Sequence, residues 1–358
     1  MKIKFFVLNQ SINGNMITTV VIVGNNNTVI TVIEGTSAEL PCNMTVRTAD
    51  DSITLILWFK EEAGRAPIYT IDARNNFQET DIVKHFSSEF LTNRASFNYS
   101  SNTSQQAVLK IEPIIDVDHG LYKCRVDFRF GRTMTTFTIL NVIVPPRKMV
   151  IVDKAGQEYN EKVLGPFDEG KDVSITCRAE GRPPPLIQWF RDNSLFDETS
   201  ETQEDHRTSL SVVHNELLLQ RISLNHLNSV LKCVASNNKL TLPLELTRII
   251  EVNLSPKTVQ IIRKPNPISA GRKLEIACET SGSRPFAEIK WLKNNKTLEH
   301  SRQTFVAETN TTLSAIIFTP TPEDDGSMII CVAENPHQKQ SSIEDRWKLY
   351  VNCTSSES

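Results

Sequence analysis

The pattern Asp-x-Gly-x-Tyr-x-Cys over residues 118–124 constrains the fold of this chain more than any other feature of its sequence. Such a run leads into strand F of a two-sheet β-sandwich of the immunoglobulin type, and the tyrosine hydroxyl bonds back to the corner backbone. Tyr122 stands two residues before Cys124, and Cys42 and Trp58 upstream occupy the places of the strand B cysteine and the strand C tryptophan. This order predicts a sandwich whose Cys42–Cys124 disulfide is covered by Trp58.

The same layout recurs twice, which predicts three tandem domains. Each unit has a first cysteine, a tryptophan and a second cysteine: Cys42, Trp58 and Cys124; Cys177, Trp189 and Cys233; Cys278, Trp291 and Cys331. A chain of 358 residues suits about three sandwiches of roughly 100 residues each. We therefore expect an all-β fold of three immunoglobulin-like sandwiches, each with a disulfide and a core tryptophan.

The first domain is expected to be of the variable type. Its cysteines are more widely spaced than those of the other pairs, which leaves room for two additional strands, whereas the second and third domains fit the shorter C2 or I type. Arg94 stands where variable-type domains pair a strand D arginine with the corner aspartate, here Asp118, and we expect a structural ion pair. The expected divisions are residues 1–28 (leader or non-globular), 29–144, 147–253 and 257–351 (domains), and 352–358 (tail).

Proline-rich turns precede the tryptophan strand in the second and third domains. They are Gly-Arg-Pro-Pro-Pro at residues 181–185 and Gly-Ser-Arg-Pro at residues 282–285. Proline fixes the backbone φ angle, so we expect rigid turns. Arg182 and Arg284 could belong to a recognition site, but a solvated loop is the simpler expectation for both.

The cysteines and the Asn-x-Ser/Thr sequons indicate an oxidising, extracellular environment. No CxxC motif or Cys/His cluster suggests metal ligands, and Cys353 is left without a visible partner, so a free thiol and an intermolecular bridge both stay open. Asn253 is a poorer glycosylation candidate because Ser255-Pro256 follows it. The expected glycosylation sites are Asn26, Asn43, Asn98, Asn102, Asn253, Asn295, Asn310 and Asn352, and a further sequon begins at Asn9.

Composition and motifs argue for a binding protein rather than an enzyme. The net charge is −3, from 39 basic and 42 acidic residues, which gives no electrostatic reason to expect nucleic-acid binding. The seven histidines are scattered, and no nucleophile motif or glycine-rich phosphate loop is present. We expect no catalytic residues, cofactor, metal or small-molecule substrate.

The sequence contains no run that approaches the ~20 apolar residues needed to span a bilayer. The apolar stretch that follows Lys2 and Lys4 is short for a signal peptide. We expect a cell-surface, single-pass membrane protein of which this chain is a part, or a secreted protein if the chain is complete.

A docking face is expected on the sheet of the first domain that holds strands G, F, C and C′. Successive strand residues point to opposite sides, so inward-pointing Trp58 and Cys124 leave their neighbours pointing outward. An apolar patch with a charged rim suits a protein interface, although another domain or a glycan could cover it. The expected binding residues are Leu57, Phe59, Tyr69, Lys123, Arg125 and Asp127, with Arg129, Phe130 and Arg132 from the loop between strands F and G.

Several runs resemble the Sidestep family of arthropod neuronal receptors. They include Leu57-Trp58-Phe59-Lys60, Pro67-Ile68-Tyr69, Cys124-Arg125-Val126-Asp127-Phe128, Gly165-Pro166-Phe167-Asp168-Glu169-Gly170 and Glu344-Asp345-Arg346-Trp347-Lys348-Leu349. The resemblance covers about residues 29–351 and implies a receptor with immunoglobulin domains that acts in axon guidance or synaptic partner choice. It also implies an immunoglobulin-superfamily partner of the Beaten path type, bound through the membrane-distal domain. The alternatives are a homophilic adhesion molecule or an immune-type receptor that uses the same face.

Overall fold

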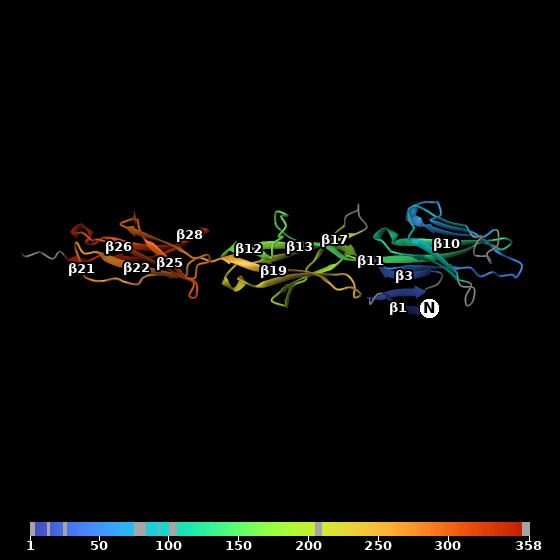
Figure 1. Cartoon of the computed structure of the whole chain (residues 1–358), viewed down its shortest axis with the longest axis horizontal. Helices are drawn as coiled ribbons and strands as arrows, with labels where there is room; N and C mark the ends of the chain where they lie inside the picture. Colours follow the sequence, from blue (N-terminus) through green and yellow to red (C-terminus); the bar gives the residue numbers. More distant parts are fainter. Residues whose placement is uncertain are drawn as a thin grey trace, which may run out of the picture.

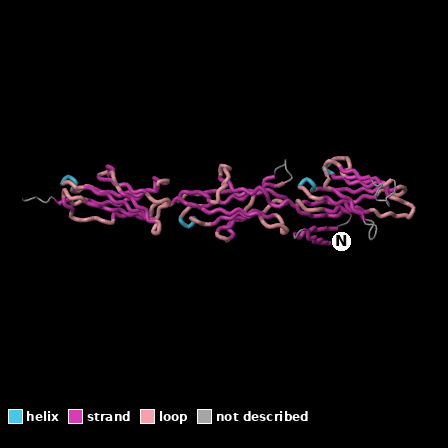
Figure 2. The backbone as a smooth tube through the Cα atoms, in the orientation of Figure 1, coloured by secondary structure: helices cyan, strands magenta, loops and turns pink. Residues whose placement is uncertain are grey.

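The computed structural model describes residues 4–12, 15–23, 27–74, 84–91, 93–99, 106–204 and 210–352. Three β-sandwiches follow one another lengthwise and form an extended rod (Figure 1). Strands, turns and short 3-10 helices make up the described residues (Figure 2). None of the helices in these ranges is long and apolar enough to cross a membrane. The expected all-β fold of three tandem sandwiches is confirmed.

The first sandwich packs a large sheet against a three-stranded sheet. The large sheet contains β3 (Asn27–Ile33), β11 (Met134–Asp153), β10 (Gly120–Phe128), β5 (Ile53–Lys60), β6 (Tyr69–Asp72) and β7 (Lys84–Ser87), in this order. The opposite sheet contains β4 (Ala38–Asn43), β9 (Gln106–Ile111) and β8 (Ala95–Tyr99). β6 and β7 are the two additional strands of a variable-type domain.

Two further strands precede β3 in the sequence. β1 (Lys4–Ile12) and β2 (Asn15–Val23) form an antiparallel hairpin, and β2 pairs with β3 at the edge of the large sheet. The edge of β3 offers unpaired backbone N–H and C=O groups, and residues 17–23 are rich in β-branched types that favour strands.

The second and third sandwiches are smaller. In the second, the continuation of β11 pairs with β13 (Val173–Arg182), followed by β17 (Ser211–Leu219) and β16 (Glu201–Glu204). Its other sheet is β12 (Val163–Asp168), β19 (Leu244–Asn253), β18 (Val230–Ser236), β14 (Leu186–Arg191) and β15 (Ser194–Asp197).

The third sandwich packs two four-stranded sheets together and adds a short strand pair. One sheet contains β20 (Thr258–Ile261), β22 (Leu274–Ser281), β26 (Thr311–Phe318) and β25 (Arg302–Val306). The other contains β24 (Lys296–Leu298), β23 (Glu288–Lys293), β27 (Met328–Asn335) and β28 (Gln338–Lys348). β21 (Ile268–Ser269) pairs with β29 (Val351–Asn352).

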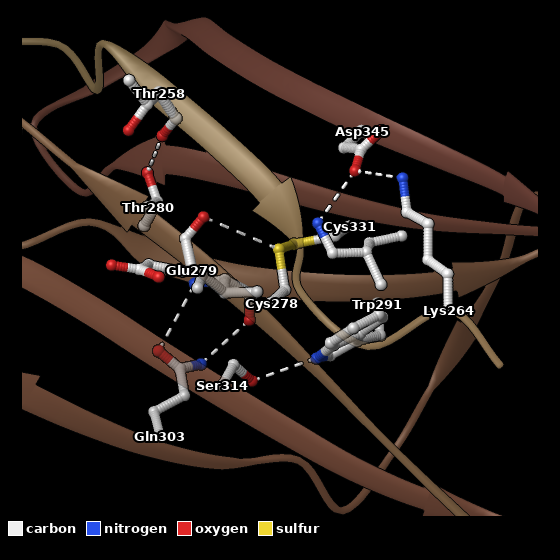
Figure 3. Close-up of a disulfide and its surroundings, with 12 residues drawn as sticks. Thr258, Lys264, Cys278, Glu279, Thr280, Trp291, Gln303, Ser314, Cys331 and Asp345 are labelled. Carbon is white, nitrogen blue, oxygen red and sulfur yellow. Dashed lines mark hydrogen bonds and ion pairs between the residues drawn. A yellow bond between two sulfur atoms is a disulfide. The ribbon is translucent and has the colours of Figure 1, made fainter.

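Each sandwich closes around one disulfide and one tryptophan. The bridges join Cys42 to Cys124, Cys177 to Cys233 and Cys278 to Cys331, and Trp58, Trp189 and Trp291 are buried beside them. Figure 3 shows the third core, where the Trp291 indole N–H donates to Ser314 Oγ at 3.0 Å. The one polar atom of the buried Trp291 side chain thus finds an acceptor.

The corner of the first domain is held by a buried ion pair. Arg94 donates from Nη1 and Nη2 to the two carboxylate oxygens of Asp118, at 2.6 and 3.0 Å, and Asp118 is fully buried. The Tyr122 hydroxyl donates to the Asp118 carbonyl at 2.8 Å. In the third domain, Lys293 on β23 bonds to the corner carboxylate of Asp324 at 2.7 Å. The buried corner aspartate is thus paired with a cation in both domains, with Arg94 just before β8 in the first and with Lys293 on β23 in the third.

Both junctions between domains use an asparagine that bonds to a backbone carbonyl between the domains. β11 runs without interruption from the first domain into the second, and the Asn237 side-chain amide donates to the Val144 carbonyl at 2.7 Å. At the second junction, the Asn335 amide donates to the Leu254 carbonyl at 2.8 Å. Each asparagine lies at the end of strand F of the following domain. Its side-chain amide holds the linker by donating to a carbonyl of the linker backbone.

The arginines of the proline-rich turns also contact the preceding domain. The expectation of a solvated loop is wrong for Arg182, which is partly buried, whereas Arg284 stays exposed. Arg182 donates to the carbonyls of Val142 and Asp116 in the first domain, at 3.2 and 2.7 Å. Arg284 makes a two-point contact with Glu251 at the end of the second domain. Sequence alone shows a charged turn, whereas the short linker brings that turn against the preceding domain.

We predict that Arg94→Ala destabilises the first domain by about 3 kcal/mol, because it leaves the buried Asp118 carboxylate without its cation. Urea unfolding followed by hydrogen-exchange mass spectrometry resolves the domains and measures this loss. Arg74→Ala is the control, since Arg74 pairs with Asp72 at the surface and its loss should leave unfolding unchanged. Equal effects of the two substitutions would contradict the structural role of the Arg94–Asp118 pair.

We predict that the double substitution Arg182→Ala with Asn237→Ala loosens the first junction, because it removes the side-chain bonds from the second domain to the Val142, Val144 and Asp116 carbonyls. Hydrogen bonds of this kind contribute about 1 kcal/mol each, and somewhat more when the donor is charged. Small-angle X-ray scattering should then show a broader distribution of interdomain distances. Arg178→Ala, on the exposed side of β13, is the matched control. An unchanged scattering profile in the double variant would show that the linker alone fixes the junction.

Candidate docking surface

The outer face of β5 and β10 presents the residues that strand alternation predicts. Trp58 and Cys124 are buried and stand opposite each other across the two strands. Lys123 lies opposite Phe59, and its Nζ is 5.6 Å from the centre of the phenylalanine ring. Arg125 lies opposite Leu57. The structure therefore brings the expected apolar and charged residues of strands C and F together on one face.

Two phenylalanines that sequence reasoning missed extend this face on both sides. Phe137 on β11 lies opposite Lys123 and is 36% exposed. Phe86 on β7 is 57% exposed and is separated from Leu57 by Thr70, its partner on β6. Continued alternation along strand G would have found Phe137, but no clear signal marked β7. We call the outward residues Leu57, Phe59, Thr70, Phe86, Lys123, Arg125, Asp127 and Phe137 the front face.

Tyr69 does not belong to the front face, so its assignment as a binding residue is corrected. It lies opposite Trp58 across β5 and β6 and therefore shares the inward direction of the tryptophan. The side chain is only 5% exposed, packs edge-on against Trp58 and bonds to His85 Nδ1 at 3.0 Å. Burial raises the pKa of the Tyr69 hydroxyl. Thr70 takes the outward position instead.

The loop between strands F and G stands at the tip of the front face. Arg129, Phe130 and Arg132 are exposed, and Phe130 reaches 69%. Its backbone is fixed by Asp51, whose carboxylate oxygens accept from the amides of Phe130 and Gly131 at 2.9 Å each. The hydrogen bond from the Phe130 amide is the main cause that lowers the pKa of Asp51. The loop is thus held in shape while its side chains stay exposed.

The carboxylate of Asp127 is engaged within the face. Arg125 Nε donates to Asp127 Oδ1 at 2.9 Å, and the Thr133 hydroxyl donates to the same oxygen at 2.7 Å. Burial opposes the charged form of Asp127, but these two bonds outweigh it and the pKa is lowered. Within the described ranges, no group of three His, Cys, Asp or Glu side chains could hold a metal ion.

The exposed sequons of the first domain lie away from the front face. Asn43 is on β4 and Asn98 is on β8, both in the opposite sheet. Asn295, Asn310 and Asn352 of the third domain are exposed, whereas Asn26, Asn102 and Cys353 lie outside the described residues. No sequon begins on β5, β6, β7, β10 or the first-domain part of β11.

Asn253 is corrected as a glycosylation site. It is only 7% exposed at the end of β19, and its amide nitrogen donates to Asp168 Oδ1 at 3.0 Å. A glycan attaches to this nitrogen, which at 7% exposure of the residue has little room for a sugar. The second domain therefore has no accessible sequon among its described residues.

Comparison with family models agrees with this architecture. An immunoglobulin V-set domain matches residues 25–144, an immunoglobulin domain matches residues 159–237, and a CD80-like C2-set immunoglobulin domain matches residues 254–342. The chain belongs to the immunoglobulin superfamily. This immunoglobulin-superfamily chain combines a V-set domain with shorter domains, as the spacing of its cysteines predicts.

The chain is also similar to curated proteins and to solved structures. Nephrin from Homo sapiens is 25% identical over 63% of this chain and 18% of nephrin. Cell adhesion molecule 2 from Xenopus tropicalis is 24% identical over 46% of this chain and 39% of that protein. The I-band fragment I67–I69 from titin aligns with a TM-score of 0.53 at 18% identity, over 90% of this chain and 96% of the fragment. The chain thus spans well under half the length of these curated relatives.

We predict that Asp51→Ala loosens the loop between strands F and G, because it removes both acceptors from the Phe130 and Gly131 amides. Hydrogen-exchange protection of these amides at pH 7 should fall, while Asp50→Ala, a neighbouring exposed aspartate, should leave it unchanged. The pKa of Asp51 is lower in the folded state, so the stabilisation is present above about pH 3.8 and is lost as the pH falls through the folded value. Undiminished protection in Asp51→Ala would show that the loop holds its shape without the carboxylate.

Proposed function

We propose that this chain is the ligand-binding region of a cell-surface receptor or adhesion protein, and that the front face of its V-set domain docks a different immunoglobulin-superfamily protein. The observation that carries the proposal is a solvent-facing apolar strip, formed by Phe137 on β11, Phe59 and Leu57 on β5, and Phe86 on β7. Phe137 and Phe86 are exposed, and Phe59 and Leu57 are partly exposed. Lys123 and Arg125 interrupt it. Aromatic and arginine side chains are the types that dominate binding energy in protein interfaces.

Two further observations support this surface over others. Among the described residues, the exposed sequons Asn43 and Asn98 lie on the opposite sheet, so glycans at these two sites leave the front face open. The junction to the second domain lies at the end of β11 away from the loop between strands F and G, so the neighbouring domain leaves the face open as well. The second domain and the glycans of Asn43 and Asn98 are thus all directed away from the patch.

The finer proposal is that the receptor is of the Sidestep type and that its partner is a Beaten path-like protein, in axon guidance or synaptic partner recognition. The runs of the first domain that resemble this family include Cys124-Arg125-Val126-Asp127-Phe128, which forms most of strand F in the front face. Relatives that include cell adhesion molecule 2 agree with a cell-surface role. A homophilic adhesion molecule is the rival function, since it could use the same apolar strip.

We predict that Phe86→Asp and Phe59→Asp weaken partner binding at least about tenfold, because each places a charge in the apolar strip. The full glycosylated chain would be screened by surface plasmon resonance against itself and against secreted immunoglobulin-superfamily ectodomains, Beaten path family members among them. Phe305→Asp is the matched control, because Phe305 is an exposed phenylalanine on β25 of the third domain.

Saturable binding to one ectodomain that is lost in the two front-face variants and kept in the control supports the proposal. Binding that both front-face variants retain would mean that another surface docks the partner. Binding of the chain to itself alone would favour the homophilic rival.

A further inference from the structure

The front face and the adjoining loop carry both cations and carboxylates. The carboxylates are bonded within the domain, whereas most of the cations form no ion pair within the part of the chain that the structure describes. Asp127 accepts from Arg125 and Thr133, and Asp51 accepts from two backbone amides of the loop. These carboxylates are therefore already satisfied from within the domain. On the cationic side, Lys123, Arg129 and Arg132 enter no ion pair with any described residue.

The contacts of these cations leave their charge available. Lys123 lies over the Phe59 ring and Arg129 over the Phe130 ring, with the Arg129 guanidinium carbon 5.1 Å from the ring centre. A cation on an aromatic face keeps its full charge and its outward N–H donors. Arg125 is itself 44% exposed although it touches Asp127.

This concentration of positive charge does not reflect the chain as a whole. The net charge is −3, so the cations of the front face stand out against a slightly acidic molecule. If two copies of the face were brought together, the cations of one copy would lie close to those of the other. These cations are Lys123, Arg125, Arg129 and Arg132. Like charges in apposition disfavour such a contact, whereas a surface of opposite sign is favoured and attracted from a distance.

We infer that the front face takes a protein surface with carboxylates arranged around an apolar centre, and that its charge excludes a second copy of itself. The inference rests on the proposed function and specifies its partner. The apolar strip favours a protein over a sulfated polysaccharide, because Phe59, Phe86 and Phe137 lose contact with water only against an apolar surface. The carboxylates of the partner would lie opposite Lys123 and the two loop arginines.

The test reverses charge on the front face and compares it with the same change elsewhere. The triple variant Lys123→Glu, Arg129→Glu, Arg132→Glu is matched by Arg272→Glu, Lys273→Glu, Lys339→Glu, three exposed cations of the third domain. Association with the ectodomain that the screen identifies is measured at about 50 and 500 mM NaCl, where surface charges are weakly and strongly screened. Heparin and the chain itself serve as additional probes.

At low salt, we expect the front-face triple variant to associate with the partner at least about tenfold more slowly than the wild type. At high salt, the difference between the two association rates should largely disappear. The third-domain variant should match the wild type. Loss of binding in Phe59→Asp with no effect of the triple variant or of salt would overturn the acidic partner and leave the docking face standing.

The remaining outcomes also decide the question. Self-association of the wild type through the front face would overturn the inference, and so would binding to heparin in the absence of any protein partner. Self-association that arises only in an equimolar mixture of the wild type and the triple variant would support it, because the two faces then carry opposite charges.

Discussion

The Cys42–Cys124 disulfide determines which side of each strand in the first domain faces the core. Because side chains alternate along a strand, one inward-pointing residue sets the direction of all the others. Cys124 and Trp58 stand opposite each other on β10 and β5, so Lys123, Leu57 and Phe59 are turned outward. A shift of one residue in this register would bury the charged residues and expose the core. The composition of the front face is therefore a consequence of the core.

This dependence explains how much of the molecule the sequence could predict. The cysteine, tryptophan and corner residues occupy characteristic positions in an immunoglobulin sandwich. Their threefold repetition therefore predicts the three-domain fold. Strand alternation extends the prediction to the front-face residues of β5 and β10. It fails for Tyr69 because its direction depends on pairing between β5 and β6, which the irregular sequence after residue 60 does not reveal. Phe86 was missed for the same reason.

The junctions could not be predicted because they depend on contacts between domains. Arg182, Arg284, Asn237 and Asn335 are polar residues at loop positions, and taken alone such residues suggest solvent exposure. Their partners are carbonyls and one carboxylate of the preceding domain, brought near only when both domains are folded and the linker is short. Asn253 shows the same limit in another way. Its sequon of three residues suggests an exposed glycosylation site, but the packing of β19 buries the side chain.

The continuity of β11 has a mechanical consequence. Its first part pairs with β10 beside the front face, and its last part pairs with β13 in the second domain. A pull on a bound partner would travel along the axis of this strand, at right angles to its antiparallel hydrogen bonds. The hydrogen bonds between the paired strands are then loaded in shear and share the force. They resist it together and do not break one after another. The strand that displays Phe137 to a partner is therefore also the one that transmits tension into the rest of the rod.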